Sequence, residues 1–230
     1  IMKDCSKAKV LVLGSSGFLG EYVANSFNCS GFDVRGASIR NSMLYFDATD
    51  ATTLDTLLHE HKPDIIVNTV GIVDVGYCEE NLQQALLINA LPNLVISKYL
   101  RKNKNCKLVY ISTDHVYNSE KLSSEETLQL TNVYSSTKYL AEVALLKTNA
   151  AIIRCNFFGN RLNGENHGLL GWVKKNAIER NCINGFSNVY FNPLRVDILA
   201  KHIVSISKKF TPGIFNIGSK DKITKYQFCK

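Results

Sequence analysis

The sequence predicts an α/β protein with a doubly wound parallel sheet and a small C-terminal lobe. Up to residue 155, short apolar runs typical of strands buried on both faces alternate with helical segments. The first run, Lys9–Leu13, leads directly into the glycine-rich turn Gly14-Ser15-Ser16-Gly17-Phe18-Leu19-Gly20 and then into a helix. Strand, glycine-rich turn and helix in this order are typical of a dinucleotide-binding unit, so we expect a Rossmann-like arrangement.

Composition places the chain among ordinary globular proteins. Of its 230 residues, 45% are hydrophobic and 20% are charged, which is enough for a buried core. No apolar run approaches the roughly 20 residues of a membrane span, so we expect no membrane partner. The net charge of +7 is spread along the chain and forms no basic stripe interleaved with aromatic residues. We therefore expect no nucleic-acid partner, and a ligand that carries phosphates explains the basic balance better.

The seven cysteines are scattered, and no two of them form a Cys-x-x-Cys pair. This pattern argues against a disulfide framework and against a zinc site, so we expect no metal and a cytoplasmic protein. The first residues contain no hydrophobic signal region. The last residues, Tyr226–Lys230, read as the opening of an unfinished helix, and we expect the C-terminus to be truncated or disordered beyond this point.

Apolar runs and turn signals predict the remaining elements in order. Up to residue 155, further strands are expected at 32–37, 44–47, 65–69, 107–112 and 151–154, with helices at 52–61, from Cys78 to about Lys102 with a kink at Pro92, and from Val133. After residue 156 the pattern loosens into helices at 169–180 and 197–208 and extended segments at 190–193 and 213–217. We expect a dinucleotide-binding domain over 8–155, with 190–210 packing back on it, and a small substrate lobe over 156–230.

The end of the second strand bears on the choice of cofactor. An NAD-preferring site usually carries an acidic residue there for the ribose 2′-hydroxyl, whereas this chain has Ser38 flanked by Arg35 and Arg40. An arginine without the acid suits a 2′-phosphate, so we expect NADP(H) to be preferred and NAD(H) to be the second choice. The alternative is that Arg40 is only a solvated loop charge. Asp47, at the end of the next strand, is placed to reach the adenine.

Tyr134 and Lys138 lie four residues apart at the head of a helical pattern, so both side chains leave the same face. A nearby ammonium favours the phenolate and lowers the pKa of the phenol, which makes Tyr134 a candidate general acid or base. The spacing alone is common, and two exposed side chains that merely share a helix face are the alternative. Ser112-Thr113-Asp114-His115 lies at the C-terminal end of the 107–112 strand, the edge at which open α/β sheets bind ligands.

Together these motifs resemble the extended short-chain dehydrogenase/reductase superfamily. The matching residues are Gly14-x-x-Gly17-x-x-Gly20, Asn68-Thr69-Val70-Gly71, Thr113 and Tyr134-x-x-x-Lys138, in the order and at the distances typical of that superfamily over residues 8–158. Within it, Ser112–Tyr117 and Asn132-Val133-Tyr134 look most like the dTDP-4-dehydrorhamnose reductase family and its sugar-nucleotide-modifying relatives. The segments Arg154–Gly159 and Phe191–Leu194 also resemble that family, though less closely.

The resemblance implies an NADPH-dependent reductase of a nucleotide-linked 4-keto sugar with three catalytic residues. Tyr134 would protonate the carbonyl oxygen as hydride leaves the nicotinamide, Lys138 would hold the nicotinamide ribose and keep the pKa of Tyr134 low, and Thr113 would hydrogen-bond the substrate oxygen. The residues expected to bind the cofactor are Gly14, Ser16, Gly17, Phe18, Leu19, Arg40, Asp47, Ala48, Asn68, Val70, Gly71, Ile111, Tyr134 and Lys138. Those expected to bind the substrate are Asp74, Asp114, His115, Asn156 and Arg195.

His115 separates the activities within the superfamily. The related 4,6-dehydratases carry a Glu at this position and GDP-fucose synthase carries a Cys, so the His argues against dehydration. An imidazole can still transfer protons near pH 7, which leaves a sugar-nucleotide epimerase or epimerase-reductase as an alternative, and a His that only contacts substrate or cofactor as another.

The resemblance has two further implications. It also reaches the regulatory subunit of methionine adenosyltransferase, so a non-catalytic NADP-binding regulatory subunit is a third alternative. Family members of this kind often dimerise through two helices, here the ones at 79–102 and at Tyr134, and both carry more apolar residues than one buried face needs. We therefore expect a homodimer.

Overall fold

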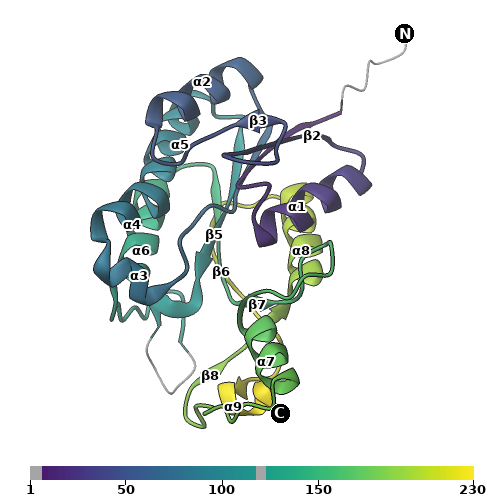
Figure 1. The fold of residues 1–230 in the computed structure, drawn as a ribbon. Coiled ribbons are helices and arrows are strands. Elements are labelled where there is room, and N and C mark those ends of the chain that lie inside the picture. The colour runs from purple at the N-terminus through teal and green to yellow at the C-terminus, as the bar shows by residue number, and fades with distance from the viewer. Residues whose placement is uncertain (1–6, 118–122) are drawn as a thin grey trace.

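The computed structural model describes residues 7–117 and 123–230, which contain a seven-stranded sheet with helices on both faces (Figure 1). Its strands are β1 (Lys9–Leu13), β2 (Asp33–Ser38), β3 (Leu44–Tyr45), β4 (Ile65–Asn68), β5 (Lys107–Thr113), β6 (Ala150–Cys155) and β10 (Gly213–Ile217). They lie in the order β10-β6-β5-β4-β1-β2-β3, and each neighbouring pair is parallel. The predicted doubly wound sheet is confirmed. The strand order reverses between β1 and β4, and such a switch point is where open α/β sheets bind ligands.

Successive residues of the central strands point into two separate cores, as the period of two in a strand requires. Val10 and Val12 of β1 pack with helices α1 (Phe18–Cys29) and α8 (Val196–Lys208) on one face of the sheet. Leu11 and Leu13 pack on the other face. That second face is covered by α2 (Ala51–His61), α5 (Leu91–Lys102) and α6 (Val133–Leu145). Both faces being buried explains why the strands read as continuous apolar runs.

The single long helix expected from Cys78 to Lys102 is wrong. The structure has three helices there: α3 (Val75–Glu80), α4 (Leu82–Asn89) and α5. Asn81 is non-helical, with φ −129° and ψ 56°, and it separates the first two. Pro92 lies in the first turn of α5 and does not kink a continuous helix, because that turn tolerates the missing N–H of proline.

The remaining elements form a small lobe at the lower end of the molecule in Figure 1. They are β7 (Phe157–Phe158), paired with β9 (Leu194–Arg195), β8 (Tyr190–Phe191), paired with β11 (Ile223–Thr224), and the helices α7 (Gly168–Ile178) and α9 (Lys225–Cys229). Phe228 of α9 packs against Phe158 and Phe191, with ring centroids 5.1 and 5.6 Å apart, and so ties both strand pairs together. The segment 213–217, which the sequence groups with the lobe, is the edge strand β10 of the main sheet.

Two features are absent from the residues that the structure describes. In residues 7–117 and 123–230, no helix is long and apolar enough to cross a membrane. The same residues contain no group of three or more His, Cys, Asp or Glu side chains arranged to hold a metal ion.

Candidate active site

The glycine-rich turn between β1 and α1 brings backbone close to backbone. Gly14 has φ +79°, a conformation that side chains rarely adopt, and a Cβ on Gly20 would lie 2.0 Å from the Gly14 carbonyl oxygen. Helix α1 begins at Phe18, and its N-cap residue, Gly17, has no side chain to cap it, so the first amide groups of the helix have no side-chain acceptor. A turn of this kind at a helix N-terminus is suited to an anionic phosphate group.

A cavity of about 450 Å³ opens beside this turn, at the carboxyl ends of the strands near the switch point. Eight of the residues predicted to bind the cofactor line it, and they come from four separate segments: Gly14, Ser16, Gly17, Arg40, Asp47, Ala48, Val70 and Gly71. Five lining residues were not predicted: Ser38, Ile39, Phe46, Thr69 and Ile88. The first four lie within two residues of predicted ones, so the sequence around the predicted residues could have indicated them as cavity-lining residues. Ile88 comes from α4, and no local motif points to it.

Several other predicted cofactor residues do not present their side chains to this cavity. Leu19 and Ile111 are buried in the core between the sheet and helices α1 and α8. The Asn68 side chain accepts a hydrogen bond from the Val70 amide at 3.0 Å and so shapes the turn from within. The Phe18 ring packs on the His167 ring, 4.4 Å between centroids. Any contact from Leu19, Ile111 or Asn68 with a dinucleotide therefore involves backbone atoms.

The two arginines at the end of β2 are separated. Arg40 is exposed and lines the cavity. Arg35 lies elsewhere, with its Nη1 3.2 Å from Nδ1 of His61 at the end of α2. Of the two, Arg40 is the arginine that lines the cavity.

Tyr134 and Thr113 meet beyond the end of β5. Asn132 caps α6 by accepting a hydrogen bond from the Ser135 amide at 2.8 Å, which places Tyr134 in the first turn of the helix. The Thr113 oxygen accepts from the His115 amide at 3.1 Å, so its own proton is available for another acceptor. The His115 ring stands edge-on to the Tyr134 ring, 5.5 Å between centroids.

The acidity of Tyr134 differs from the expectation. Burial raises the pKa of Tyr134 well above its usual value, and a side-chain contact with Thr113 opposes this effect. The expected lowering by Lys138 does not act here, and the reason is the position of the ammonium. Lys138 Nζ donates a 2.7 Å hydrogen bond to the carbonyl of Ile111 and lies 4.5 Å from the centroid of the Tyr110 ring.

Lys138 connects Tyr134 to the cavity. A Cβ added to the cavity-lining Gly71 would lie 3.5 Å from Lys138 Nζ, so the ammonium is close to the cavity wall. Burial lowers the pKa of Lys138 to about 8, while nearby Cys155 and Glu142 act in the opposite direction. The group is therefore still mostly charged at pH 7.

The residues predicted to bind substrate fall into two sets. Asp114 begins a short 3₁₀ turn (Asp114–Val116), and its two carboxylate oxygens each lie 3.3 Å from Asn156 Nδ2. These two residues and His115 gather near Thr113. Asp74 instead caps α3, accepting from the Tyr77 amide at 2.9 Å. Arg195 forms an exposed ion pair with Asp197 at 2.6 Å, which occupies its guanidinium.

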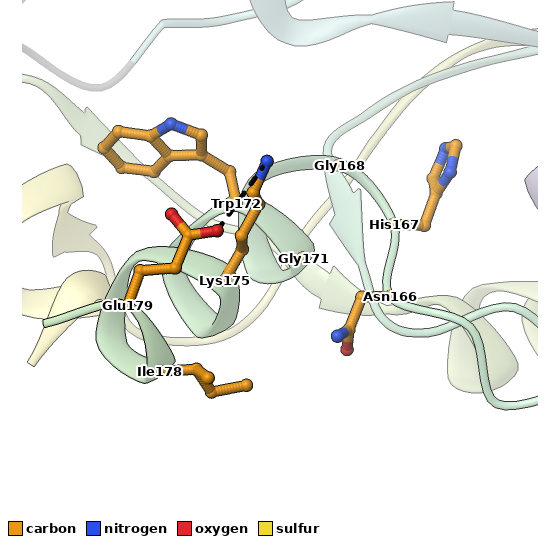
Figure 2. A pocket seen from close by; sticks show the side chains of 8 residues that line it. All are labelled: Asn166, His167, Gly168, Gly171, Trp172, Lys175, Ile178 and Glu179. Atoms are coloured by element: carbon orange, nitrogen blue, oxygen red, sulfur yellow. Dashed lines mark ion pairs between the residues drawn. The ribbon is translucent and has the colours of Figure 1, made fainter. Parts of the chain in front are cut away.

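The lobe contains a cavity of its own, of about 400 Å³. Figure 2 shows its lining on α7 and the segment before it: Asn166, His167, Gly168, Gly171, Trp172, Lys175, Ile178 and Glu179. Trp172, Lys175 and Glu179 lie together over the helix, while His167 stands apart from them. Because His167 packs on Phe18, this segment also connects the lobe to the glycine-rich turn.

Comparison with known proteins gives the family. The family described as RmlD substrate binding domain matches residues 8–230. The chain belongs to this family. Two relatives are each 25% identical over 96% of the chain: the spore coat polysaccharide biosynthesis protein SpsK of Bacillus subtilis, of which 77% is covered, and a dTDP-4-keto-6-deoxy-D-glucose reductase of Streptomyces niveus, of which 76% is covered.

Two further comparisons bear on the fold and on the alternatives. The dTDP-4-dehydrorhamnose reductase of Bacillus anthracis, solved in complex with NADP, has the same fold, with a TM-score of 0.86, 20% identity and coverage of 99% of this chain and 80% of that one. A methionine adenosyltransferase 2 subunit beta of Rattus norvegicus is 27% identical over 64% of this chain and 46% of its own length. The family predicted from the sequence is confirmed, and with it the class of NAD(P)-dependent oxidoreductase.

Lys138 should leave a signature in the pH dependence of stability. Between pH 8 and its ordinary pKa of 10.5, the unfolded chain holds a proton on Lys138 that the folded chain has released. The contribution of Lys138 to the free energy of unfolding therefore rises with pH through this window. Lys138→Met removes that contribution, so the stability of the parent relative to the variant should increase from pH 8 to pH 10.5 by up to about 3 kcal/mol.

Denaturant unfolding of parent and variant at several pH values measures this difference. Burial raises the pKa of Cys106 and of Cys155 to about 12, and their contributions fall above pH 9. The contribution of Cys106 cancels because both proteins contain it. Cys155 interacts with the Lys138 charge, so both proteins carry Cys155→Ala in this comparison. Lys98→Met, at an exposed position of α5, controls for the loss of a lysine as such. A difference between parent and Lys138→Met that stays flat or falls with pH would show that Lys138 is not held in this way.

Proposed function

We propose that this chain is an NADPH-dependent reductase of a nucleotide-linked 4-keto sugar, with Tyr134 as the general acid. The observation that carries the proposal is the position of three predicted side chains around the C-terminal part of β5, next to the cavity at the glycine-rich turn. Thr113 contacts Tyr134, and the Lys138 ammonium lies next to the cavity wall at Gly71. The reductase name of the Streptomyces niveus relative supports the substrate class.

The residues present fit a nicotinamide dinucleotide. The uncapped start of α1 and the close approach at Gly20 suit a pyrophosphate, and Arg40 is the arginine that lines the same cavity. In this proposal Arg40 pairs with the 2′-phosphate and Lys138 holds the hydroxyls of the nicotinamide ribose. The cofactor, when bound, supplies the hydride that reduces the keto carbon.

In this proposal, side chains of this protein supply the proton and position the substrate. Because its pKa is high, Tyr134 carries its proton at neutral pH and can give it to the carbonyl oxygen, which becomes a strong base as the carbon is reduced. The Thr113 hydroxyl holds that oxygen in hydrogen-bonding distance of the phenol.

Tyr134→Phe tests the chemistry directly. The substitution keeps the ring and its packing and removes the proton, so turnover should fall by about 10²–10⁴-fold, the usual effect of losing a general acid. Affinity for NADPH should barely change. The measurement is NADPH oxidation with a panel of nucleotide-linked keto sugars, together with cofactor titration. Tyr99→Phe is the matched control, because Tyr99 is a buried tyrosine of α5 and not one of the three proposed catalytic residues. Full activity of Tyr134→Phe would refute the assignment of Tyr134 as the general acid.

Arg40→Ala tests the choice of cofactor. A charge-assisted pair contributes about 1.5–3 kcal/mol, so NADPH should bind the parent about 10- to 100-fold more tightly than the variant, whereas NADH affinity should stay the same. Arg35→Ala is the matched control, because the structure places that guanidinium against His61 and outside the cavity. Equal affinities of the parent for NADPH and NADH, measured by calorimetric titration, would contradict the proposed preference.

We also propose a homodimer formed through α4 and α6. A groove of about 610 Å³ runs between these helices and the segment before α6, and exposed Leu82, Leu140 and Val143 line it. Light scattering at micromolar concentration should give the mass of two chains, and Leu140→Glu should give one. Ile178→Glu, on α7 of the lobe, should leave the mass unchanged. A parent protein that is monomeric at this concentration would end the proposal.

The compartment we propose is the cytoplasm. The six cysteines in the part of the chain that the structure describes are all free thiols. Free thiols are maintained in reducing compartments, which fits this placement.

Two alternatives have an observation in their favour. The His115 ring lies beside Tyr134, and a second proton transfer by this imidazole would suit an epimerase or epimerase-reductase. The similarity to methionine adenosyltransferase 2 subunit beta favours a non-catalytic NADP-binding regulatory subunit. The activity panel separates them. Sugar with an inverted centre indicates the first alternative: an epimerase gives it without net NADPH consumption, and an epimerase-reductase gives it with NADPH consumption. NADPH binding without any turnover indicates the second.

A further inference from the structure

Lys225, the first residue of α9, holds its ammonium against an aromatic cluster of the lobe. Its Nζ lies 3.7 Å from the centroid of the Phe191 ring. Phe191 in turn packs against Phe228, which contacts Phe158. The ammonium thus contacts one ring, which two rings from other segments help to hold in place.

The aromatic face attracts this ammonium but accepts none of its three protons in an ordinary hydrogen bond. Within residues 7–117 and 123–230, no hydrogen bond or ion pair of Lys225 Nζ is formed, whereas Lys138 Nζ donates to Ile111. In that same part of the chain, the Tyr110 hydroxyl is the one fully buried side-chain polar atom without a partner. Lys225 Nζ is not among such atoms, so it is partly accessible to solvent, and an acceptor from a ligand can reach it.

The ring cluster connects Lys225 to the segment that carries candidate substrate residues. Phe158 of the cluster follows Asn156 by two residues, and Asn156 Nδ2 lies 3.3 Å from each carboxylate oxygen of Asp114. The negative charge of Asp114 opposes the lowering of the Lys225 pKa that burial causes, which agrees with this connection. The packing of the lobe and the Asp114 charge together associate the ammonium with the candidate active site.

We propose that Lys225 binds the diphosphate of the nucleotide-linked substrate, an inference that rests on the proposed function. A partly buried ammonium with free donors is suited to a multiply charged oxyanion, since the attraction is stronger there than in bulk water. A sugar hydroxyl alone would not offset the cost of burying the charge. Lys222, three residues earlier, lies 4.6 Å from the Tyr190 ring and is exposed, so it makes a similar aromatic contact at the surface.

The test is calorimetric titration with three diphosphates (dTDP, UDP and GDP), with thymidine and with NADPH. Lys225→Met keeps most of the side-chain volume and removes the charge, so affinity for the best-bound diphosphate should fall by about 10- to 100-fold. Affinities for thymidine and NADPH should stay at the parent values. Lys225→Arg should restore most of the diphosphate affinity, and Lys222→Met, the matched control, should bind like the parent.

The inference is overturned if Lys225→Met binds the diphosphate as tightly as the parent, if NADPH affinity falls equally, or if the parent binds none of the three diphosphates. Melting temperatures of the variants check that the lobe remains folded, and Lys225→Arg keeps the test meaningful if the Met variant unfolds. Keto-sugar reduction by the parent is measured separately. If the parent reduces no keto sugar but binds a diphosphate in a way that depends on Lys225, the proposed function is refuted and the binding site remains. If the parent reduces a keto sugar but its diphosphate binding does not depend on Lys225, only the role of Lys225 is refuted.

Discussion

The buried ion pair between Arg154 of β6 and Glu142 of α6 is the interaction on which the candidate site depends. Both side chains are 1% exposed, and charges removed from water in this way are tolerated only when their hydrogen bonds are satisfied. Arg154 Nε lies 3.0 Å from one Glu142 oxygen, and Nη2 lies 2.5 Å from the other. Nη1 donates to the Tyr117 hydroxyl and to the Glu125 carbonyl, each at 2.7 Å. Each guanidinium nitrogen thus has an acceptor, so the pair fixes the helix on the sheet in one orientation.

This pair sets the geometry of the site through its neighbours in sequence. Glu142 is one turn beyond Lys138 on α6, and it also accepts a hydrogen bond from the Ser112 hydroxyl at 2.5 Å, next to Thr113 on β5. A shift of the helix along the sheet would therefore move Lys138 and Tyr134 relative to Thr113 and would also leave a buried charge unpaired. Because the second event is costly, the relative position of the three side chains is well defined before any ligand arrives.

Local patterns in the sequence were enough for the parts of the site that depend on backbone conformation and strand ends. The glycines of the turn, the position of Thr113 at the end of β5 and the spacing of Tyr134 and Lys138 all follow from short-range rules. In the structure the glycines line the cavity, and the Lys138 ammonium lies close to its wall at Gly71. The Arg154–Glu142 pair did not stand out, because a Glu in a helix and an Arg in a strand read as surface charges until both elements are packed. The direction of the pKa of Tyr134 was missed for the same reason, since burial depends on the whole fold.

Burial shifts the pKa values of two groups at the candidate site, Tyr134 and Lys138. Burial makes the charged form costly for both groups, so the free protein holds a phenol that keeps its proton and an ammonium whose pKa is lowered to about 8. The two groups respond in opposite ways: the phenol is a weaker acid than usual, whereas the ammonium releases its proton more readily than usual. The Lys138 ammonium is held by the Ile111 carbonyl of β5, and it does not lower the pKa of Tyr134 in the free protein. The spacing of four residues thus places both groups on one face of α6, but burial, and not their mutual attraction, sets both acidities.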